Sequence, residues 1–138
     1  MSTDAGLDLF KAVRAAILAD TYLAAQLGAR VYSSWDNQDA ATPLVRMSIP
    51  AARKFEMDGA GVGSETDLWV HVFTVESGSA VCRAIANKVR DVLDGQALAL
   101  DGSSLISLDF RDVVPVRDDQ SPKLQMLIVR FQAETVTA

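Results

Sequence analysis

The sequence predicts an α+β fold: a mainly antiparallel sheet of four to five strands packed with two helices, in the order α-β-β-β-α-β-β. Three observations support this prediction. Residues 66–94 change from the two-residue period of a strand to the spacing of a helix near residue 77. Three further stretches alternate like strands, and turn-forming residues separate them. The chain opens with an amphipathic helical pattern, and its 138 residues predict one domain, 1–138.

The first element is a predicted helix over residues 4–19. Thr3 or Asp4 can cap its start, and the acids Asp4 and Asp8 lie near the positive end of its dipole. A short helical turn over residues 21–27 follows, and Gly28 suits a left-handed cap at its end. The apolar face of the first helix is predicted to comprise Leu7, Phe10, Val13, Ile17 and Leu18.

Residues 29–33 predict a short strand, and residues 35–43, rich in Asn, Asp and Pro, predict a loop. Residues 44–50 alternate between apolar and polar, as a half-exposed strand does. Residues 51–65 keep some strand character before Gly59, Gly61 and Gly63 alternate with small residues. This glycine run predicts a mobile hairpin tip.

The strand predicted at the end of this hairpin, residues 66–75, carries large apolar groups on both faces. One face has Leu68, Val70 and Val72, and the other has Trp69, His71, Phe73 and Val75. Such a strand needs cover on both sides. A helix follows from about residue 77 to 94, with Ser77 or Ser79 as its cap. Its predicted apolar stripe comprises Val81, Cys82, Ile85, Ala86, Val89, Val92 and Leu93.

A second hairpin closes the chain. Gly95 ends the helix, and the Asp101–Gly102 turn leads into a strand over residues 105–115. After a polar turn at 117–122, residues 123–136 return as the last strand. The predicted inner face of the first strand is Ile106, Leu108, Phe110 and Val114; the last strand has Leu127, Val129 and Phe131 on one face and Met126, Ile128, Arg130 and Gln132 on the other.

Composition narrows the possible partners. The 18 acidic residues exceed the 13 basic ones, so the net charge of −5 argues against nucleic-acid binding driven by phosphate neutralisation. The single cysteine, Cys82, lies on the apolar helix face and is interpreted as a small buried hydrophobe rather than a reactive thiol. The charged N-terminal segment resembles neither a signal peptide nor a membrane span, which predicts a soluble protein with no membrane partner.

No set of residues predicts catalysis. His71, the only histidine, lies between aromatic residues in a strand, without a second histidine or a cysteine at metal-ligand spacing. The serines lie outside a GxSxG elbow, and the glycine spacing is not that of a phosphate-binding loop. Candidate carboxylates fall in predicted turns, where solvated acids are common: Asp58, Glu65 and Asp67, or Asp118 and Asp119. The prediction is therefore a protein that is not an enzyme, with no catalytic, cofactor or metal site.

Several apolar groups fall outside the predicted core. Trp35 lies in a polar loop, Phe55 and Met57 precede the glycines, and Met126 and Ile128 lie opposite the main inner face. One helix layer covers one side of a sheet. Either the remaining helix or a neighbouring subunit must cover the other side.

The succession of these elements resembles the tail terminator, or tail completion (head-to-tail joining), proteins of long-tailed bacteriophages and gene transfer agents. The resemblance covers nearly the whole chain. It is carried by LAAQLGARVY at 23–32, TPLVRMSI at 42–49, ETDLWVHVFT at 65–74, the helix SAVCRAIANKVRDVLDG, LALDGSSLISLDFRDVVPVRDD at 98–119 and LQMLIVRFQAET at 124–135. The junction VESGS at 75–79 departs from the more charged helix start of that family.

The resemblance implies a structural protein without catalytic residues or cofactors. It implies a homo-oligomer, a hexameric ring on the end of the tail tube, that stops tube polymerisation and joins the tail to a head-tail connector or head completion protein. DNA would pass through the ring without specific binding. The protein would assemble in the bacterial cytoplasm and end at the head-proximal end of the tail in the particle.

The resemblance also suggests which surfaces meet partners. The loops over residues 34–42 and 52–64 would contact other tail or head proteins, and the sheet edges would supply the subunit contacts. The partner-contacting set is Trp35, Asp36, Arg53, Phe55, Met57, Asp58, Gly59, Gly61 and Gly63; the subunit-interface set is Trp69, His71, Phe73, Met126 and Ile128. The alternatives are a small non-enzymatic module that binds a peptide or protein strand at a sheet edge, and an enzyme with an unrecognised carboxylate site.

Overall fold

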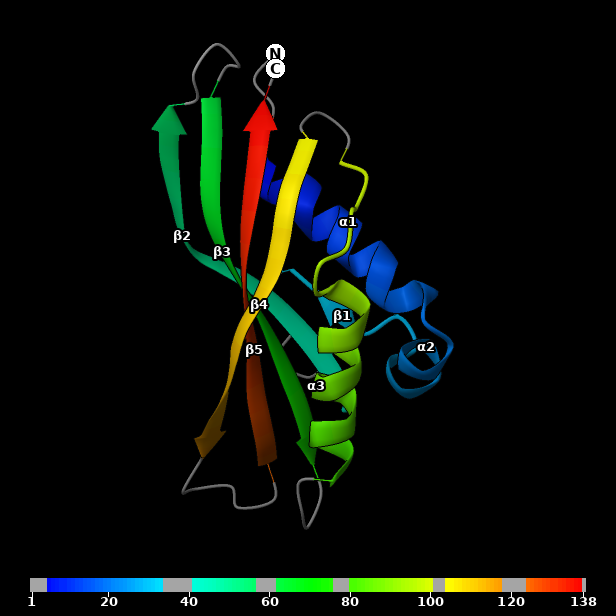
Figure 1. Cartoon of the computed structure of the whole chain (residues 1–138). Coiled ribbons are helices and arrows are strands. Elements are labelled where there is room, and N and C mark those ends of the chain that lie inside the picture. Colours follow the sequence, from blue (N-terminus) through cyan, green and yellow to red (C-terminus); the bar gives the residue numbers. More distant parts are fainter. Residues whose placement is uncertain are drawn as a thin grey trace.

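A computed structural model describes residues 5–33, 41–56, 62–75, 80–100, 104–117 and 124–137 (Figure 1), without the side chains of residues 5, 55, 56, 62, 106, 117 and 137. Three helices and five strands lie in these ranges. They are α1 (Ala5–Ala19), α2 (Thr21–Leu27), β1 (Val31–Tyr32), β2 (Leu44–Glu56), β3 (Val62–Val75), α3 (Ala80–Leu93), β4 (Ser104–Arg117) and β5 (Leu124–Thr137).

The strands form one sheet in the order β1-β2-β3-β5-β4, in which β1 pairs with β2 in parallel and the other neighbours are antiparallel. The predicted mixture of helices and a sheet is confirmed. The prediction of two helices is wrong, because residues 21–27 form a separate helix. Asp20 caps it by accepting a hydrogen bond from the Leu23 N–H at 3.0 Å, and Gly28 ends it with φ of 60°.

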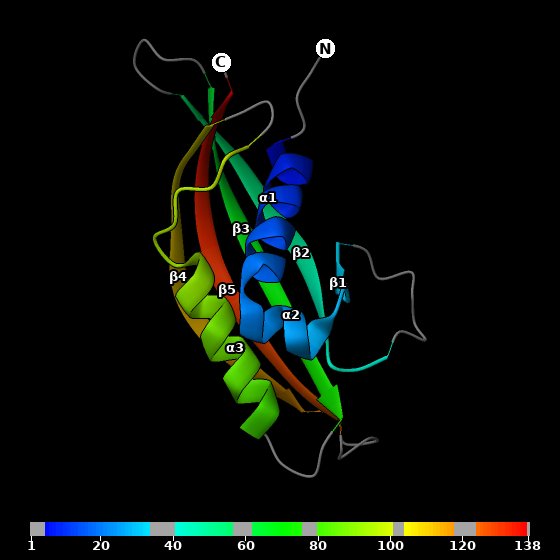
Figure 2. The same ribbon diagram turned by 90° about the vertical axis from the view of Figure 1, so that its right-hand side faces the viewer.

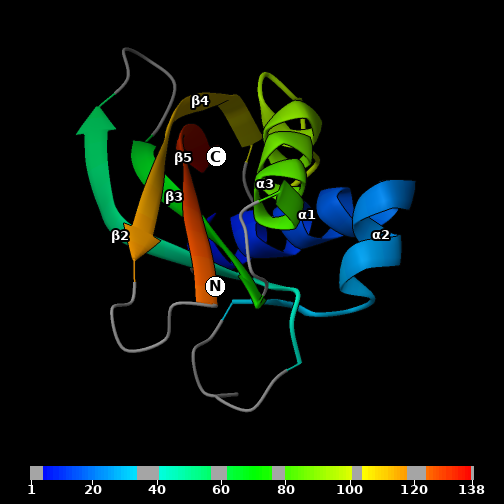
Figure 3. The ribbon, with the colours of Figure 1, turned by 90° about the horizontal axis from the view of Figure 1, so that it is seen from below.

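All three helices cover the same face of the sheet (Figure 2), and the core lies between the two layers. Helix α1 crosses the strands, and α3 runs along β4 and β5. The core includes Leu9, Val13 and Ile17 from α1, Leu68, Val70 and Val72 from β3, Ile85 and Val89 from α3, and Val129 and Phe131 from β5. Among the described residues, no helix lies on the opposite face of the sheet (Figure 3).

The helix faces differ from the prediction at their first turns. Leu9 is fully buried, whereas the side chain of Leu7 is 49% exposed, because α1 turns positions 9, 13 and 17 toward the sheet. Val81, predicted to be buried, is 40% exposed at the start of α3. Cys82 is buried as predicted, with its Sγ 3.5 Å from the carbonyl oxygen of Val72.

The hairpin of β2 and β3 is longer than the sequence predicted. The sequence predicted strands over residues 44–50 and 66–75, with only some strand character between them before a glycine-rich tip. In the structure β2 continues to Glu56 and β3 begins at Val62. Gly63 is a buried strand residue that pairs with Phe55 on one side and Val136 on the other. Strand partners on both sides stabilise an extended backbone that the glycine-rich sequence does not favour alone.

Two irregularities in β4 change which of its side chains face the core. The register with β5 shifts between Leu105 and Ser107 and again between Phe110 and Asp112. A bulge reverses the alternation of side chains, since it adds one unpaired residue to the strand. Val114 therefore pairs with Ile128 on the face without helices, and its predicted place on the inner face is wrong.

Candidate interaction surface

The face of the sheet without helices is the candidate functional surface. Strand register arranges its residues in rows that cross β3, β5 and β4. Two rows form what we call the apolar half: Phe73, Met126 and Val116, then His71, Ile128 and Val114, with Trp69 beside them. The adjoining rows form what we call the polar half: Arg130 and Asp112, then Asp67, Gln132 and Asp109, then Glu65 and Glu134, with Arg53 of β2 opposite Glu65 and Arg111 at the β4 bulge.

Aromatic side chains line β3 in the apolar half. The ring centroids of His71 and Phe73 lie 6.4 Å apart with nearly parallel planes, and those of Trp69 and His71 lie 6.2 Å apart. Trp69, Phe73 and Met126 are only half-buried, whereas Ile128 is buried. In the single chain, part of this aromatic row is therefore exposed to water, although burying aromatic side chains against another surface is stabilising.

His71 is the least exposed member of that aromatic row. Its side chain is buried, and its Nε2 lies 3.0 Å from the Ser48 Oγ. The cross-strand neighbour on β2 is Arg46, whose guanidinium lies 5.4 Å from the centre of the Tyr32 ring. Burial lowers the pKa of His71 below its ordinary value of about 6.5, so the imidazole is neutral at pH 7.

We expect this lowered pKa to make the fold less stable in mild acid. The unfolded chain takes up a proton near pH 6.5, whereas the folded chain resists it, so the free energy of unfolding falls as pH drops below about 6.5. Urea midpoints between pH 8 and pH 5 measure the slope, and the variant His71→Gln should flatten it. An equal slope in the variant would assign the acid sensitivity to other groups.

The polar half is cross-linked by its own side chains. Arg53 contacts Glu65 and Asp67 at 3.0 Å each, and the Gln132 amide donates to Glu65 at 2.7 Å. Arg130 donates two hydrogen bonds to Asp112, which lowers the pKa of that carboxyl. The Arg53 guanidinium thus forms ion pairs with Glu65 and Asp67, two of the candidate catalytic acids.

The bulge in β4 adds a hollow to the polar half. Because the bulge interrupts the alternation of β4, the consecutive residues Arg111 and Asp112 both line this hollow. Arg111 donates a hydrogen bond to Gln132. The guanidinium of Arg130 lies 5.6 Å from the centre of the Trp69 ring. The hollow measures about 190 Å³ and is lined by Asp67, Trp69, Arg111, Asp112, Arg130 and Phe131.

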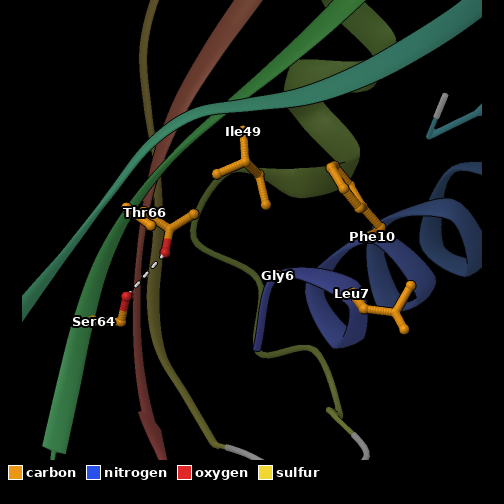
Figure 4. A pocket seen from close by; sticks show the side chains of 7 residues that line it. Gly6, Leu7, Phe10, Ile49, Ser64 and Thr66 are labelled. Atoms are coloured by element: carbon orange, nitrogen blue, oxygen red, sulfur yellow. Dashed lines mark hydrogen bonds between the residues drawn. The ribbon is translucent and has the colours of Figure 1, made fainter. Parts of the chain in front are cut away.

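A groove of about 370 Å³ lies on the other side of the sheet, between the first turns of α1 and the bend of β2 and β3 (Figure 4). Its wall is mainly apolar, and the Ser64 and Thr66 hydroxyls lie 3.4 Å apart at its floor. The lining residues are Gly6, Leu7, Phe10, Ile49, Ala52, Ser64 and Thr66. Within the described ranges, no three metal-binding side chains gather here or elsewhere.

The predicted subunit-interface residues share one surface. Trp69, His71 and Phe73 lie on the face without helices, beside Met126 and Ile128 of the adjacent strand. Of the predicted partner-contacting residues, Arg53 is exposed and Gly63 is buried in β3 rather than in a loop. Phe55 lies in β2, although its side chain is not described. The others, Trp35, Asp36, Met57, Asp58, Gly59 and Gly61, lie outside the described residues, as do Ser77, Ser79, Asp118 and Asp119.

Sequence reasoning missed the polar network and the contribution of β4. Arg130 and Asp112 are 18 positions apart, and only the strand register brings them together. A bulge has no marker in the sequence of β4, so Arg111, Val114 and Val116 could not be assigned to this face by alternation alone.

The sequence profile of the family described as tail completion protein gp17 matches residues 11–135. The chain belongs to this tail completion family. A chain from the solved virion of a native gene transfer agent particle has a similar fold, with a TM-score of 0.79 and 26% identity over 98% of this chain and 99% of its own. A second solved structure has a TM-score of 0.63 and 15% identity over 96% and 94% of the two chains, which shows the fold alone.

Family membership confirms the resemblance carried by the sequence and identifies a structural protein of phage-type tails. The comparison with curated proteins found none that matches this chain in sequence. In the described part of the chain, no helix is long and apolar enough to cross a membrane.

Proposed function

We propose that this protein forms a hexameric ring at the head-proximal end of a tail tube, ends tube polymerisation, and joins the tail to a head-tail connector or head completion protein. The similarity to a chain of a gene transfer agent virion supports this role. The protein would act in a phage or gene-transfer-agent particle after assembly in the bacterial cytoplasm.

The apolar half of the uncovered sheet face is the observation that carries the proposal. Trp69, Phe73 and Met126 are half-buried in the single chain, and Val116 is 36% exposed. Burying this surface against a second copy would stabilise the assembly by roughly 25 cal/mol per Å² of apolar area removed from water. Copies joined in a closed ring leave no free end, so assembly stops at a fixed size.

The length of β2 suits a protein that joins two partners. The segments 34–40 and 57–61, which contain most of the predicted partner-contacting residues, attach at opposite ends of β2. At roughly 3.3 Å per residue, the 13 residues of β2 span about 40 Å. We propose that one end meets the tail tube protein and the other the head component.

The charge distribution fits a channel for DNA that does not bind it. Eight of the 18 acidic residues, but only one of the 13 basic residues, Lys123, lie in the sequence segments 1–4, 34–40, 57–61, 76–79, 101–103 and 118–123. Acids at the ends of the strands would repel the phosphate backbone during passage. A ring whose lumen proved basic would contradict this part of the proposal.

Deleting the gene in a strain that produces the particles is the direct test. We expect tail tubes of irregular, extended length and heads without tails, because nothing would end polymerisation or join the two parts. Electron microscopy measures both, and expression of the intact protein should restore tails of uniform length. Uniform tails attached to heads in the deletion strain would contradict the proposal. A chain that stays monomeric even on tails would favour a module that binds a partner strand at a sheet edge.

A further inference from the structure

The two edges of the sheet are protected to different degrees. On the outer edge of β4, the Gly95 N–H donates to the Leu108 carbonyl at 2.8 Å, and the Phe110 N–H donates to the Asp94 carboxylate at 2.9 Å. The turn after α3 therefore occupies the backbone groups to which an added strand would bond. The two register shifts in β4 also disrupt a regular edge.

Within the described residues, no segment other than β1 pairs with the outer edge of β2, which has a single register shift, between Ser48 and Ala51. Strand β1 pairs only with Val45 and Arg46, and in the described ranges residues 51–56 have a strand partner only on the β3 side. Ala51 and Ala52 leave the backbone accessible, and the Arg53 side chain is held by acids of β3. Natural proteins rarely leave a long edge open, so residues 51–56 are a candidate site for an added strand.

A complementary segment lies on the other side of the molecule. Residues 96–100 run extended from the end of α3 toward β4, on the side opposite β2 (Figure 1). Leu98 and Leu100 pack against the core, whereas Ala97 and Ala99 are exposed. Within the described residues, positions 97–100 make no backbone hydrogen bond. The segment thus has the alternation of a strand but lacks a strand neighbour.

We propose that residues 51–56 of one copy pair, strand to strand, with residues 96–100 of the next copy around the ring. This inference rests on the proposed ring and adds a second subunit contact, at the sheet edges, to the one proposed for the apolar half. Main-chain hydrogen bonds would satisfy both segments, and small side chains on each would permit close approach. The contact joins two different surfaces, so it repeats from copy to copy until the ring closes.

Pairing of β2 with β2 of a second copy is the competing arrangement. It would bring the Arg53 and Lys54 side chains of two copies close together across an antiparallel pair, and like charges placed opposite one another destabilise such a pair. Residues 96–100 carry no charge and avoid this repulsion.

Thiol cross-linking within assembled rings tests the proposal. The double variant Ala52→Cys/Ala99→Cys, treated with a short bifunctional maleimide, should give covalent products up to the full ring on denaturing gels. Each single variant should remain monomeric on those gels, because Cys82 is fully buried and only one exposed thiol is present. The matched control Ala52→Cys/Ala84→Cys, with its second thiol on the exposed surface of α3, should also remain monomeric.

Native mass spectrometry of the same samples, free or isolated on tails, separates this inference from the proposed function. Rings present without the covalent ladder would overturn the pairing and leave the ring intact. Efficient dimers from Ala52→Cys alone would support β2–β2 pairing and overturn the proposal. Absence of rings in every sample would overturn the proposed function itself.

Proline substitution gives an independent measurement. Ala99→Pro should leave the thermal midpoint of the monomer nearly unchanged, since position 99 makes no backbone hydrogen bond in the described chain. It should weaken ring formation about tenfold or more, because proline removes a donor and obstructs an added strand. Unchanged ring formation would overturn the pairing.

Discussion

Replacing Phe131 with alanine is expected to lower the free energy of unfolding by about 3–5 kcal/mol. Phe131 is 1% exposed in β5, which lies between β3 and β4, and its ring meets Phe110 edge to face at 6.0 Å. The substitution removes this ring and leaves a cavity between the sheet and α3, which the packed core can fill only in part. Urea unfolding followed by tryptophan fluorescence measures the change.

Leu7→Ala is the matched control for this prediction. Leu7 is also a large apolar residue, but it is 49% exposed in α1 and should cost less than about 1 kcal/mol. A loss below about 1.5 kcal/mol for Phe131→Ala would mean that the layers rearrange to fill the cavity. The core would then be less tightly packed than its burial indicates.

Val116→Asp is expected to weaken ring assembly by about 100-fold or more. Val116 lies in the apolar half of the uncovered face, opposite Met126, and a carboxylate buried there without a partner costs about 3 kcal/mol. The monomer should change little, since this side chain is 36% exposed in the single chain. Sedimentation velocity, or electron microscopy of tail ends, measures assembly.

Val113→Asp provides a control in the same strand. Val113 is equally exposed, at 36%, but it pairs with Val129 on the opposite face of the sheet. Both variants place a carboxylate in β4, so any general effect on this strand is common to them. A difference in their ring assembly therefore shows that the face carrying Val116 is buried in the ring. Equal assembly of both variants would remove the apolar half from the subunit contact.

Hydrophobic period was sufficient to predict most elements of this protein. The change from two-residue to helical spacing predicted β3 and α3, and alternation placed Trp69, His71 and Phe73 on the opposite face from Leu68, Val70 and Val72. The period reports which side of each element is apolar, and that information is local. Family resemblance followed from the same order of elements, and the match over residues 11–135 confirms it.

Features that depend on strand pairing could not be predicted from the local sequence. Gly63 is extended because two neighbouring strands bond to its segment, and Val114 faces away from the helices because a bulge reverses β4. The contact of Arg130 with Asp112 likewise depends on register.

The sequence by itself therefore determined most of the elements, most of their apolar sides and the family to which this chain belongs. Only the tertiary structure decided the strand order, the extent of the β2–β3 hairpin and which sheet edge remains open. The physical reason is that register and edge protection depend on hydrogen bonds between segments far apart in the chain. Hydrophobic period describes only neighbouring residues.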